Sequence, residues 1–481
     1  MRLSSLQFSV QPWGRFWALA WVLSGGLAQT GCLVQDPAWE APAETDADST
    51  SGSSQGTSDV SSETGGATES TGAVPTDELP ADCAPLPSVP ADAIAVSPAD
   101  NETLHIIFAD APPGGTIALE PGVYDRAGQP TLVVSAVGVT VRSTTGDPDD
   151  VVLAGGPSTV SLISVRASDV LLAEFTMRTS DDTLVDIGVD DAVLDHDQLY
   201  RMVMRDAAAT KLDVGPGLAR WTDDGVIACS TFEQGDAFRD GLSECGGVSA
   251  VRISGGARWT LRDNIFEGHW CTTTSYATVV ADRGSSDTRV ERNILKNNFR
   301  GILLGGDDVA DGRPEPASDA CGEPEGPGWG HVRGVIVNNV TWVDDPRMVG
   351  AVPTSDTDLD SMIGFWHVCG AIAVHNTSYV ALTTFNGIEW RYADTSVTVA
   401  NNLISTTLVS RDDGVALGVD HNVTGIGAAE FVDAAGGDFR LAPGSMARDS
   451  GIVIPAIPVS EDFDRNERTG RPDLGAFESQ P

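Results

Sequence analysis

The chain has 481 residues and a formal net charge of −40, with 29 basic side chains against 69 acidic ones. A surface this acidic repels the phosphate backbone of nucleic acids, so DNA and RNA are excluded as expected partners. With 52 glycines, 27 prolines and only 20% charged residues, frequent turns are expected and long charged helices are not. Lysine occurs only at Lys211 and Lys296, so a cationic site would depend on particular arginines.

The first 32 residues have the layout of an export signal. Arg2 and Arg15 precede a short apolar run over residues 16–23, and LAQTGC ends the segment at Cys32. The run is too short to favour a membrane-spanning helix and fits a cleaved signal peptide over residues 1–32. The TGC ending resembles that of bacterial lipoproteins, although Gln29 stands where those signals have an aliphatic residue. The resemblance implies lipidation of Cys32 and a membrane anchor in the cell envelope, at the outer membrane or cell surface, with secretion as the alternative.

Lipidation of Cys32 would also account for an odd number of cysteines. Of the seven cysteines it leaves six, namely Cys83, Cys229, Cys245, Cys271, Cys321 and Cys369. An even set in an exported protein can form disulfides, and the sequence leaves their connectivity open. Metal binding is the weaker interpretation of these cysteines, because no C-x-x-C spacing occurs among them.

Residues 33–82 are almost entirely Ser, Thr, Gly, Asp, Glu, Ala and Pro, as in TSGSSQGTSDVSSETGGATESTG. Such a segment cannot bury enough apolar surface to offset the entropy of ordering it, so we expect a disordered linker. Between an anchor and a folded domain, its simplest role is a tether. The folded domain is therefore expected over residues 83–481.

Short apolar runs separated by turn residues fill the folded region. Residues 104–108 predict a short helix or strand at its beginning, and residues 112–124 predict two strands separated by a turn. The next runs, about ten residues apart, are TLVVS, VTVRS, VVLAG, SLISV and DVLLAEFTM. No long helical pattern separates them, which argues against alternating helices and strands.

A repeated unit organises the second half of the chain. The stretch Arg289–Gly306 places two short apolar strands around an Asn-Asn turn, and its halves recur as WTLRDNIF, VIVNNVTW, IAVHNTSY, VTVANNLI and GIEWR. Asparagines recur at Asn264, Asn293, Asn376 and Asn402, in units of about 26–29 residues where no loop is inserted. Repeats of this length with short strands predict a parallel β-helix, in which stacked asparagines bond from coil to coil. An antiparallel sandwich or a propeller is the structural alternative.

PGGTIALEPGVY (113–124), the strand–Asn–strand units and DFDRNERTGRPDLGAFE (462–478) resemble bacterial secreted β-helix proteins of the pectate-lyase-like superfamily. In the last segment Arg471, Asp473 and 475–478 match the pattern, and RGILLG, GHVRGVIVNN, HNTS and GIEWR together resemble one branch of it. The resemblance covers about residues 105–478. It implies an all-β fold, a single-stranded right-handed parallel β-helix with long loop insertions. It says little about activity, because the superfamily includes lyases, hydrolases, epimerases and proteins with no known chemistry.

In that superfamily one sheet usually lines a saccharide groove. Here we expect it to contain residues 250–254, 278–283, 301–306, 363–368 and 387–391. With Ile388 and Trp390 inward, the two-residue period points Glu389 and Arg391 outward together. Either Trp366 or His367 is then one coil from that pair, and Arg252, Asp282 or Arg283 lies on coils further along.

A uronate lyase needs a cation to neutralise the sugar carboxylate and a base to remove the adjacent proton. Arg252, Arg283, Arg300 and Arg391 could supply the cation, and an arginine is too basic to be an easy base. A histidine is chemically easier, with His367 preferred over His331 and His269. We therefore predict His367, Glu389, Arg391 and Arg300 as catalytic, and Arg252, Asp282, Arg283, His331 and Trp366 as substrate-binding.

A glycoside hydrolase would instead need two carboxylates about 5–9.5 Å apart. Asp282 and Glu389 are expected three coils apart, roughly 14 Å, and Asp307 or Asp308 is expected about 10 Å from Glu389. The lyase interpretation is therefore preferred for an acidic polysaccharide. The alternatives left open are a non-catalytic binding or adhesion module and a purely structural surface protein, in which Glu389 and Arg391 are only a surface ion pair.

No cofactor is predicted, with calcium left open. Carboxylates alternate at Asp356, Asp358 and Asp360, and Asp462 and Asp464 resemble the opening of a calcium loop. Both segments lack the glycine and glutamate spacing of an EF-hand, so solvated acidic loops are the default. The expected partners are a polysaccharide and, through the lipid, a membrane. The protein itself is expected to be a monomer.

Overall fold

The computed structural model describes residues 79–480 except 191, 218–219, 242–247, 272–275, 307–311, 314–327, 349–360, 382–385, 455–456 and 458. The predicted signal peptide, most of the predicted linker, Cys32, Cys245, Cys321, Asp307, Asp308 and Asp356, Asp358 and Asp360 lie outside the described residues. The packed region begins at Leu79, slightly before the predicted boundary at Cys83, because Leu79 is buried against the domain. None of the helices in the described ranges is long and apolar enough to cross a membrane.

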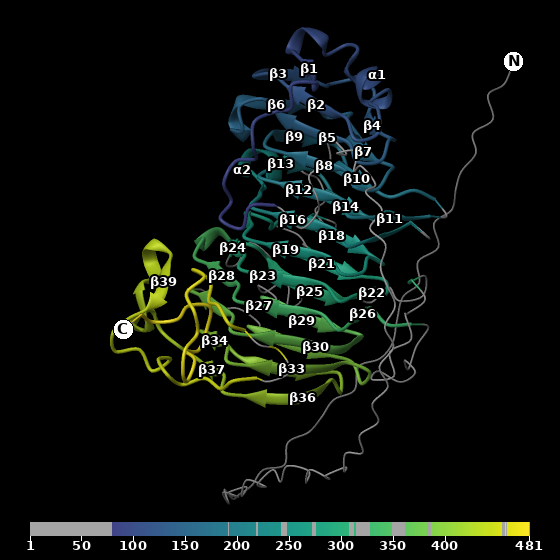
Figure 1. Ribbon diagram of the computed structural model, residues 1–481. Helices are drawn as coiled ribbons and strands as arrows, with labels where there is room; N and C mark the ends of the chain where they lie inside the picture. Colours follow the sequence, from purple (N-terminus) through teal and green to yellow (C-terminus); the bar gives the residue numbers. More distant parts are fainter. Residues whose placement is uncertain are drawn as a thin grey trace, which may run out of the picture. The chain divides into compact units, whose positions relative to one another are not determined.

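Three long sheets of parallel strands make up the domain, and successive strands of the chain go to each sheet in turn (Figure 1). A typical coil runs from β23 (Arg289–Glu291) through β24 (Ile294–Lys296) to β25 (Arg300–Gly305). Each strand then pairs with its counterpart in the next coil, as Val290 pairs with Ile336 and Leu303 with Gly364. This arrangement is the parallel β-helix that the repeats predict.

The 10-stranded sheet, called here the groove sheet, contains β4 (Leu132–Val134), β7 (Ser161–Val165), β10 (Thr183–Ile187), β14 (Thr210–Val214), β18 (Ser249–Ser254), β21 (Ala277–Asp282), β25, β29 (Ile363–Trp366), β32 (Ile388–Arg391) and β35 (Leu408–Arg411). The 11-stranded sheet contains β3 (Gly122–Asp125), β6 (Val151–Ala154), β9 (Thr176–Ser180), β13 (Val203–Ala207), β17 (Thr231–Glu233), β20 (Ile265–Glu267), β24, β28 (Val340–Val343), β31 (Thr377–Val380), β34 (Leu403–Ile404) and β37 (Val423–Thr424).

The 14-stranded sheet contains β1 (Ile94–Val96), β2 (Thr116–Leu119), β5 (Thr140–Ser143), β8 (Leu171–Ala173), β12 (Gln198–Tyr200), β16 (Val226–Ala228), β19 (Thr260–Arg262), β22 (Ser285–Ser286), β23, β26 (His331–Val332), β27 (Val335–Val337), β30 (Val368–Val374), β33 (Ser396–Ala400) and β36 (Val415–Asp420). Short strands outside these sheets are β11 (Val193–Asp195) with β15 (Trp221–Asp223), and β38 (Phe431–Asp433) with β39 (Asp438–Leu441). The helices of the described ranges are α1 (Leu104–Ala109) and the short α2 (Asp236–Arg239).

The interior is a continuous apolar core because inward residues of successive coils stack on one another. Val251, Val279, Ile302, Ile363 and Ile388 form one such column on the groove sheet, and all are buried in the main core. A coil alone would leave these side chains in water, so stacking supplies most of the stabilisation.

The predicted asparagine stack is present and longer than the sequence alignment indicated. Asn264, Asn293, Asn339, Asn376, Asn402 and Asn422 form a ladder in which each side-chain amide donates to the next carbonyl oxygen, at 2.8–3.1 Å. The left-handed backbone belongs to the residue before each ladder asparagine, such as Arg292 (φ 52°) and His375 (φ 53°). The asparagine side chain therefore makes the hydrogen bonds of the ladder, and the residue before it adopts the left-handed conformation that turns the chain. Asn298 lies at a different corner, where it accepts from the His269 backbone.

The two ends of the domain differ. At the beginning, α1 buries Leu104 and Phe108 against the core, which resolves the predicted helix-or-strand segment as a helix. Described residues after 425, including Phe431, Phe439 and Leu474, form a separate apolar cluster against β28 and β34 of the 11-stranded sheet, while Ile454 and Val459 pack against β27, β30 and β33 of the 14-stranded sheet. Arg468, nearly buried, holds this tail by bonding Glu478, Asn338 and the Gly475 carbonyl.

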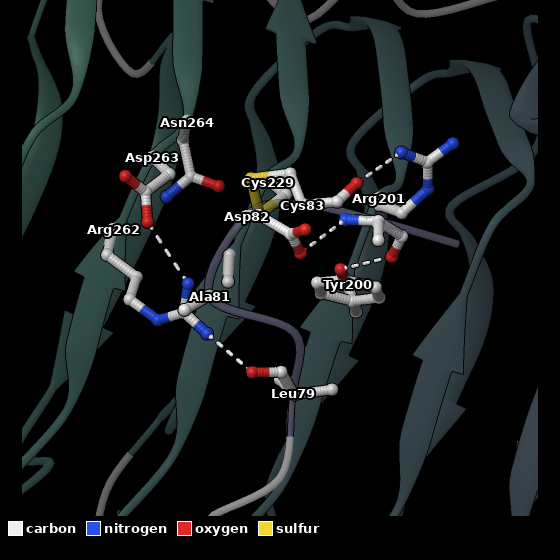
Figure 2. Close-up of a disulfide and its surroundings, with 12 residues drawn as sticks. Leu79, Ala81, Asp82, Cys83, Tyr200, Arg201, Cys229, Arg262, Asp263 and Asn264 are labelled. Carbon is white, nitrogen blue, oxygen red and sulfur yellow. Dashed lines mark hydrogen bonds and ion pairs between the residues drawn. A yellow bond between two sulfur atoms is a disulfide. The ribbon is translucent and has the colours of Figure 1, made fainter. Parts of the chain in front are cut away.

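One disulfide, Cys83–Cys229, fixes residues 79–87 across the outer face of the 14-stranded sheet. Figure 2 shows the segment lying over the strands, with Tyr200 donating to the Ala84 carbonyl and Arg201 to the Cys83 carbonyl, both at 2.6 Å. Cys271 and Cys369 are disulfide-bonded as well. The close approach of Cys83, Cys229 and Asp263 is thus that of a disulfide beside a carboxylate, since the thiolate ligands a metal would need are absent there.

Candidate functional site

Each of the five segments predicted for the groove sheet contributes a strand to it, in the predicted order, although Arg283 and His367 follow their strands and Val368 begins β30 of the 14-stranded sheet. In the outward column through its centre, Asp186, Asp213, Arg252, Val280, Leu303, Gly364 and Glu389 follow one another on successive strands. Two residues further along the strands, Asp282, Trp366 and Arg391 lie in a second outward column, with Trp366 beside Arg391. Of the two residues predicted as candidates for the position one coil from the Glu389–Arg391 pair, Trp366 is the one directly beside Arg391.

Predicted residues from three coils meet in what we call the Trp366 cluster, which comprises Arg300, Trp366, His367, Glu389, Arg391, Tyr392 and Asp394. The guanidinium carbons of Arg300 and Arg391 lie 5.1 and 4.8 Å from the centroid of the Trp366 ring. These are cation–π distances, so the indole interacts with two guanidinium groups, one from the coil before it and one from the coil after it. Arg391 also forms an ion pair with Asp412, at 2.7 Å.

Glu389 is fully buried, which corrects the expectation of a carboxylate that contacts substrate. Its Oε1 accepts from the Trp366 indole nitrogen at 3.0 Å, and its Oε2 accepts from Asn386 at 3.0 Å and Arg411 at 3.2 Å. Three donors satisfy this buried charge. Glu389 therefore fixes the indole ring and does not face a ligand.

His367 forms a dyad with Asp394, a residue that the sequence did not single out. The His367 Nδ1 lies 3.0 Å from both Asp394 carboxylate oxygens, and the imidazole stacks on the Tyr392 ring at 4.0 Å with planes 7° apart. A carboxylate at Nδ1 favours the tautomer with the proton there, which leaves Nε2 as the basic atom. The His367 side chain is 23% exposed, whereas Asp394 is nearly buried. This geometry is that of an oriented base.

A second charged group, the Arg252 cluster (Asp186, Asp213, Arg252, Ser254 and Asp282), lies further along the groove sheet, on β10, β14, β18 and β21. Arg252 donates to Asp282 at 2.8 Å, and Ser254 donates to the same carboxylate at 3.0 Å. Burial raises the pKa of Asp282, against the opposing effects of Arg252 and Ser254. Burial also raises the pKa of Asp213 to about 6, and its Oδ1 has no hydrogen-bond partner among the described residues.

The two clusters are separate. Arg252 and Glu389 are four coils apart, roughly 19 Å at the usual strand spacing. Between them Ala277, Val280 and Leu303 form a buried apolar patch that also contains Trp366, with Tyr276 packed against it. A ligand contacting both clusters would have to extend across this patch.

His331 lies outside the groove, which corrects its assignment to substrate binding. It belongs to β26 of the 14-stranded sheet, is fully buried, and its Nε2 lies 2.9 Å from the Thr288 hydroxyl. Burial lowers the pKa of His331 to about 3. His269 is likewise buried, and burial lowers its pKa well below the ordinary value. Neither imidazole is placed to take a proton from a ligand in the groove.

Arg283 follows β21 with a left-handed backbone (φ 55°), at the edge of the groove sheet, and its carbonyl accepts from the Arg313 amide. The calcium candidates in the tail have other partners. Asp462 is buried and accepts from the Asn466 and Glu478 amides, and Asp464 pairs with Arg440 at 2.8 Å. The hydrogen bonds of the tail account for both carboxylates without a cation.

The sequence did not single out five residues of the two clusters, namely Asp186, Asp213, Ser254, Tyr392 and Asp394. Asp213 had a signal, because it interrupts the apolar strand TKLDV at an outward position. Asp394 and Tyr392 had none, since each follows a strand in a segment that looks like an ordinary turn.

No family model matches the chain, and no curated protein matches its sequence. Among solved structures, the chain is similar to the pectate lyase Pel9A, with 15% identity and a TM-score of 0.53 over 82% of this chain and 98% of that one. It is also similar to an alginate lyase from Paenibacillus sp. str. FPU-7 (14% identity, TM-score 0.45, 69% of this chain and 98% of that one). A third similar structure is a polygalacturonase from Erwinia carotovora (9% identity, TM-score 0.37, 70% of this chain and 97% of that one). At these identities the likeness concerns the fold, and the chain has the pectate-lyase-like right-handed parallel β-helix fold.

Proposed function

We propose that this protein is a cell-envelope lipoprotein whose β-helix binds an acidic polysaccharide at the Trp366 cluster and cleaves it by β-elimination next to a uronate. The observation that carries the proposal is the His367–Asp394 dyad, stacked on Tyr392 beside an indole that two arginines flank. The name of the structural neighbour Pel9A, a pectate lyase, supports the same substrate class.

Each residue has a distinct role in this mechanism. Arg300 and Arg391 neutralise the sugar carboxylate, which makes the proton on the adjacent carbon more acidic. The Nε2 of His367 removes that proton, while Asp394 keeps the imidazole in the required tautomer and stabilises its charged form. The bond to the leaving oxygen then breaks and a carbon–carbon double bond forms in the product. Glu389 and Trp366 position the arginines.

A hydrolase is less well supported by the same geometry. Hydrolysis needs two carboxylates that reach the scissile bond, about 5–9.5 Å apart. Glu389 is buried with both oxygens bonded, and Asp394 is bonded to His367. A non-catalytic binding module is the second candidate, since the ion pair between Arg391 and Asp412 already neutralises one cation of the site.

The test uses the full chain carrying Cys32→Ser, so that the protein is not lipidated, with a panel of uronate-containing polysaccharides. A lyase gives unsaturated products that absorb in the ultraviolet. His367→Gln should lower the rate about 10²–10⁴-fold, as loss of a general base does, and Asp394→Asn should lower it less. Arg391→Gln should weaken binding, and Arg289→Gln on the 14-stranded sheet is the matched control.

Three outcomes are distinguishable. Unsaturated products that disappear with His367→Gln support the lyase. Saturable glycan binding that Arg391→Gln weakens, with no product from any polymer, leaves a binding module. If no polymer gives products and glycan binding is unchanged in both variants, the site proposal fails.

The envelope location is tested separately. Labelled palmitate should be incorporated into the wild-type chain in the producing bacterium and not into Cys32→Ser, and the labelled protein should fractionate with outer membranes. Equal labelling of both chains would contradict lipidation at Cys32.

A further inference from the structure

The last coil of the β-helix is open, because all three sheets end on it. β35, β36 and β37 are terminal strands of the groove, 14-stranded and 11-stranded sheets, and within the described ranges none has a partner on its far side. Figure 1 shows β36 as the last strand of its stack. The asparagine ladder also stops here. Asn402 donates to Asn422 at 2.8 Å, and no described side chain accepts from the Asn422 amide.

Apolar side chains lie exposed along this edge. Val415, Leu417 and Val419 of β36 are 47%, 67% and 48% exposed. Val419 is the counterpart of Val399, which is fully buried one coil earlier. A hollow of about 380 Å³, lined by Leu408, Val419, Asn422 and Thr424 among others, opens at the same coil. The core thus reaches the end of the solenoid without a cover from the described chain.

The opposite end is closed. There α1 places Leu104 and Phe108 on the core of the first coil, and β1 pairs with β2. Solenoids need polar caps at both ends to stay soluble as single units. The described residues that follow the last coil instead pack on the sides of the solenoid, against the 11-stranded sheet through Phe431 and Phe439 and against the 14-stranded sheet through Ile454 and Val459.

We propose that the open coil is an interface between two copies of this chain, joined tail to tail about a two-fold axis, with β36 pairing antiparallel to β36 of the second copy. This is an interaction beyond the proposed function, and it departs from the monomer expected from sequence. An antiparallel pair of identical strands is two-fold symmetric by construction, which is the commonest symmetry of protein dimers.

The shape of the surface favours a second copy over other occupants. The open coil presents three strand edges around one hollow, and a second open coil is the surface that offers three matching edges at once. A head-to-tail stack is excluded, because α1 covers the first coil. The chain's own residues 41–78 have only Val60 and Val74 as large apolar residues, so this stretch cannot cover Leu417 and its neighbours.

Charge sets how such a dimer responds to salt. Asp412 and Asp413 precede β36, and Asp420 ends it, so antiparallel pairing brings carboxylates of the two copies near one another at both ends of the strand. The centre of the contact is apolar. Salt screens the repulsion and leaves the apolar contact intact, so association should strengthen as ionic strength rises.

The experiment measures the mass of the full chain carrying Cys32→Ser by analytical ultracentrifugation over a range of concentration and salt. A reversible dimer is expected, tighter at higher salt. Leu417→Lys, which places a charge at the centre of the edge strand, should raise the dissociation constant at least tenfold. Ile106→Lys on α1 is the matched control, since Ile106 is 49% exposed at the closed end and should leave the dimer unchanged.

A second variant tests the geometry. In a two-fold symmetric β36–β36 pair centred on Leu417, the two Leu417 residues lie directly opposite each other on the same face, so Leu417→Cys should form a covalent dimer on mild oxidation and Ile106→Cys should not. A chain that stays monomeric at every concentration and salt overturns the proposal. So does a dimer that Leu417→Lys leaves intact, or that Ile106→Lys dissociates equally. Binding to phospholipid vesicles that Leu417→Lys abolishes, with no dimer in solution, would assign the open end to a membrane surface instead.

Discussion

The asparagine ladder gives the sharpest test of how the coils are held together, and Asn376→Ala is the change that probes it. The Asn376 carbonyl oxygen accepts from the backbone and side-chain nitrogens of Asn339, at 3.0 and 3.1 Å. Its amide donates to the carbonyls of Ile336 and Val374 and to Asn402. All of these groups are buried, so no water can replace the lost side chain.

The magnitude follows from the groups left without partners. A buried backbone donor without an acceptor costs about 1–3 kcal/mol, and the Asn339 amide becomes such a donor. The lost bond to the Ile336 carbonyl and the small void add to this, so Asn376→Ala should lower the free energy of unfolding by about 3 kcal/mol. Asn422→Ala is the matched control. It removes the same side chain from the half-exposed end of the ladder, where water can bond Asn402, and should cost about 1 kcal/mol.

The assay is urea unfolding combined with hydrogen exchange. Exchange at the Asn339 amide should accelerate in Asn376→Ala and stay slow in Asn422→Ala, because only the first change removes its acceptor. Equal destabilisation by both substitutions, or an Asn339 amide that remains protected in Asn376→Ala, would refute the view that the ladder stabilises the coils through buried bonds.

Three further predictions rest on buried groups. Burial lowers the pKa of Lys211 to about 7, so the unfolded chain binds more protons than the folded chain between about pH 7 and the ordinary lysine pKa of 10.5. The free energy of unfolding should therefore rise with pH across that window. Lys211→Met should reduce this pH dependence in urea unfolding. Replacing Cys83 and Cys229 by alanine opens a loop of 146 residues, which should lower the unfolding free energy by about 5 kcal/mol in the chain-entropy picture, with exchange of residues 79–87 as the local readout. Glu389→Gln leaves a single acceptor for the donors of Trp366, Asn386 and Arg411, and should cost about 2 kcal/mol in thermal or urea unfolding; a neutral effect would contradict its role as the anchor of the indole.

The sequence was sufficient to predict the fold and much of the groove sheet. Alternation in GIEWR predicted that Glu389 and Arg391 point outward together, and the stacking of coils predicted that either Trp366 or His367 lies one coil away; Trp366 is the residue directly beside Arg391. Both follow from local periodicity, which the stacking of coils preserves. The burial of Glu389 and His331 could not be predicted in this way, because it depends on partners from other coils, namely Arg411 and Thr288, and on Asn386 in the loop before β32.

The edge of the groove sheet explains why the Trp366 cluster forms where it does. Gly255, Arg283, His367, Tyr392 and Asp412 each follow a strand of this sheet, occupy the same register position, and have left-handed backbones. A residue other than glycine costs about 1–2 kcal/mol in this conformation. Of these five positions, one has glycine and four have residues with side chains; His367 contacts the next coil, whereas Asp412 contacts the coil before it. His367 thus stacks on Tyr392, and Asp412 reaches Arg391.

This geometry separates function from stability at His367. His367→Gly loses the Asp394 bond and the Tyr392 stack, together about 1–3 kcal/mol, and regains about 1–2 kcal/mol of backbone strain. The unfolding free energy should therefore change by less than about 1 kcal/mol, while any lyase activity is lost. His367→Ala makes the same contacts disappear and keeps the strain, so it should be less stable than His367→Gly by about 1 kcal/mol in urea unfolding. If the two variants unfold at the same urea concentration, the left-handed backbone at His367 is not strained. The presence of a residue other than glycine at this position would then be no evidence for a functional role.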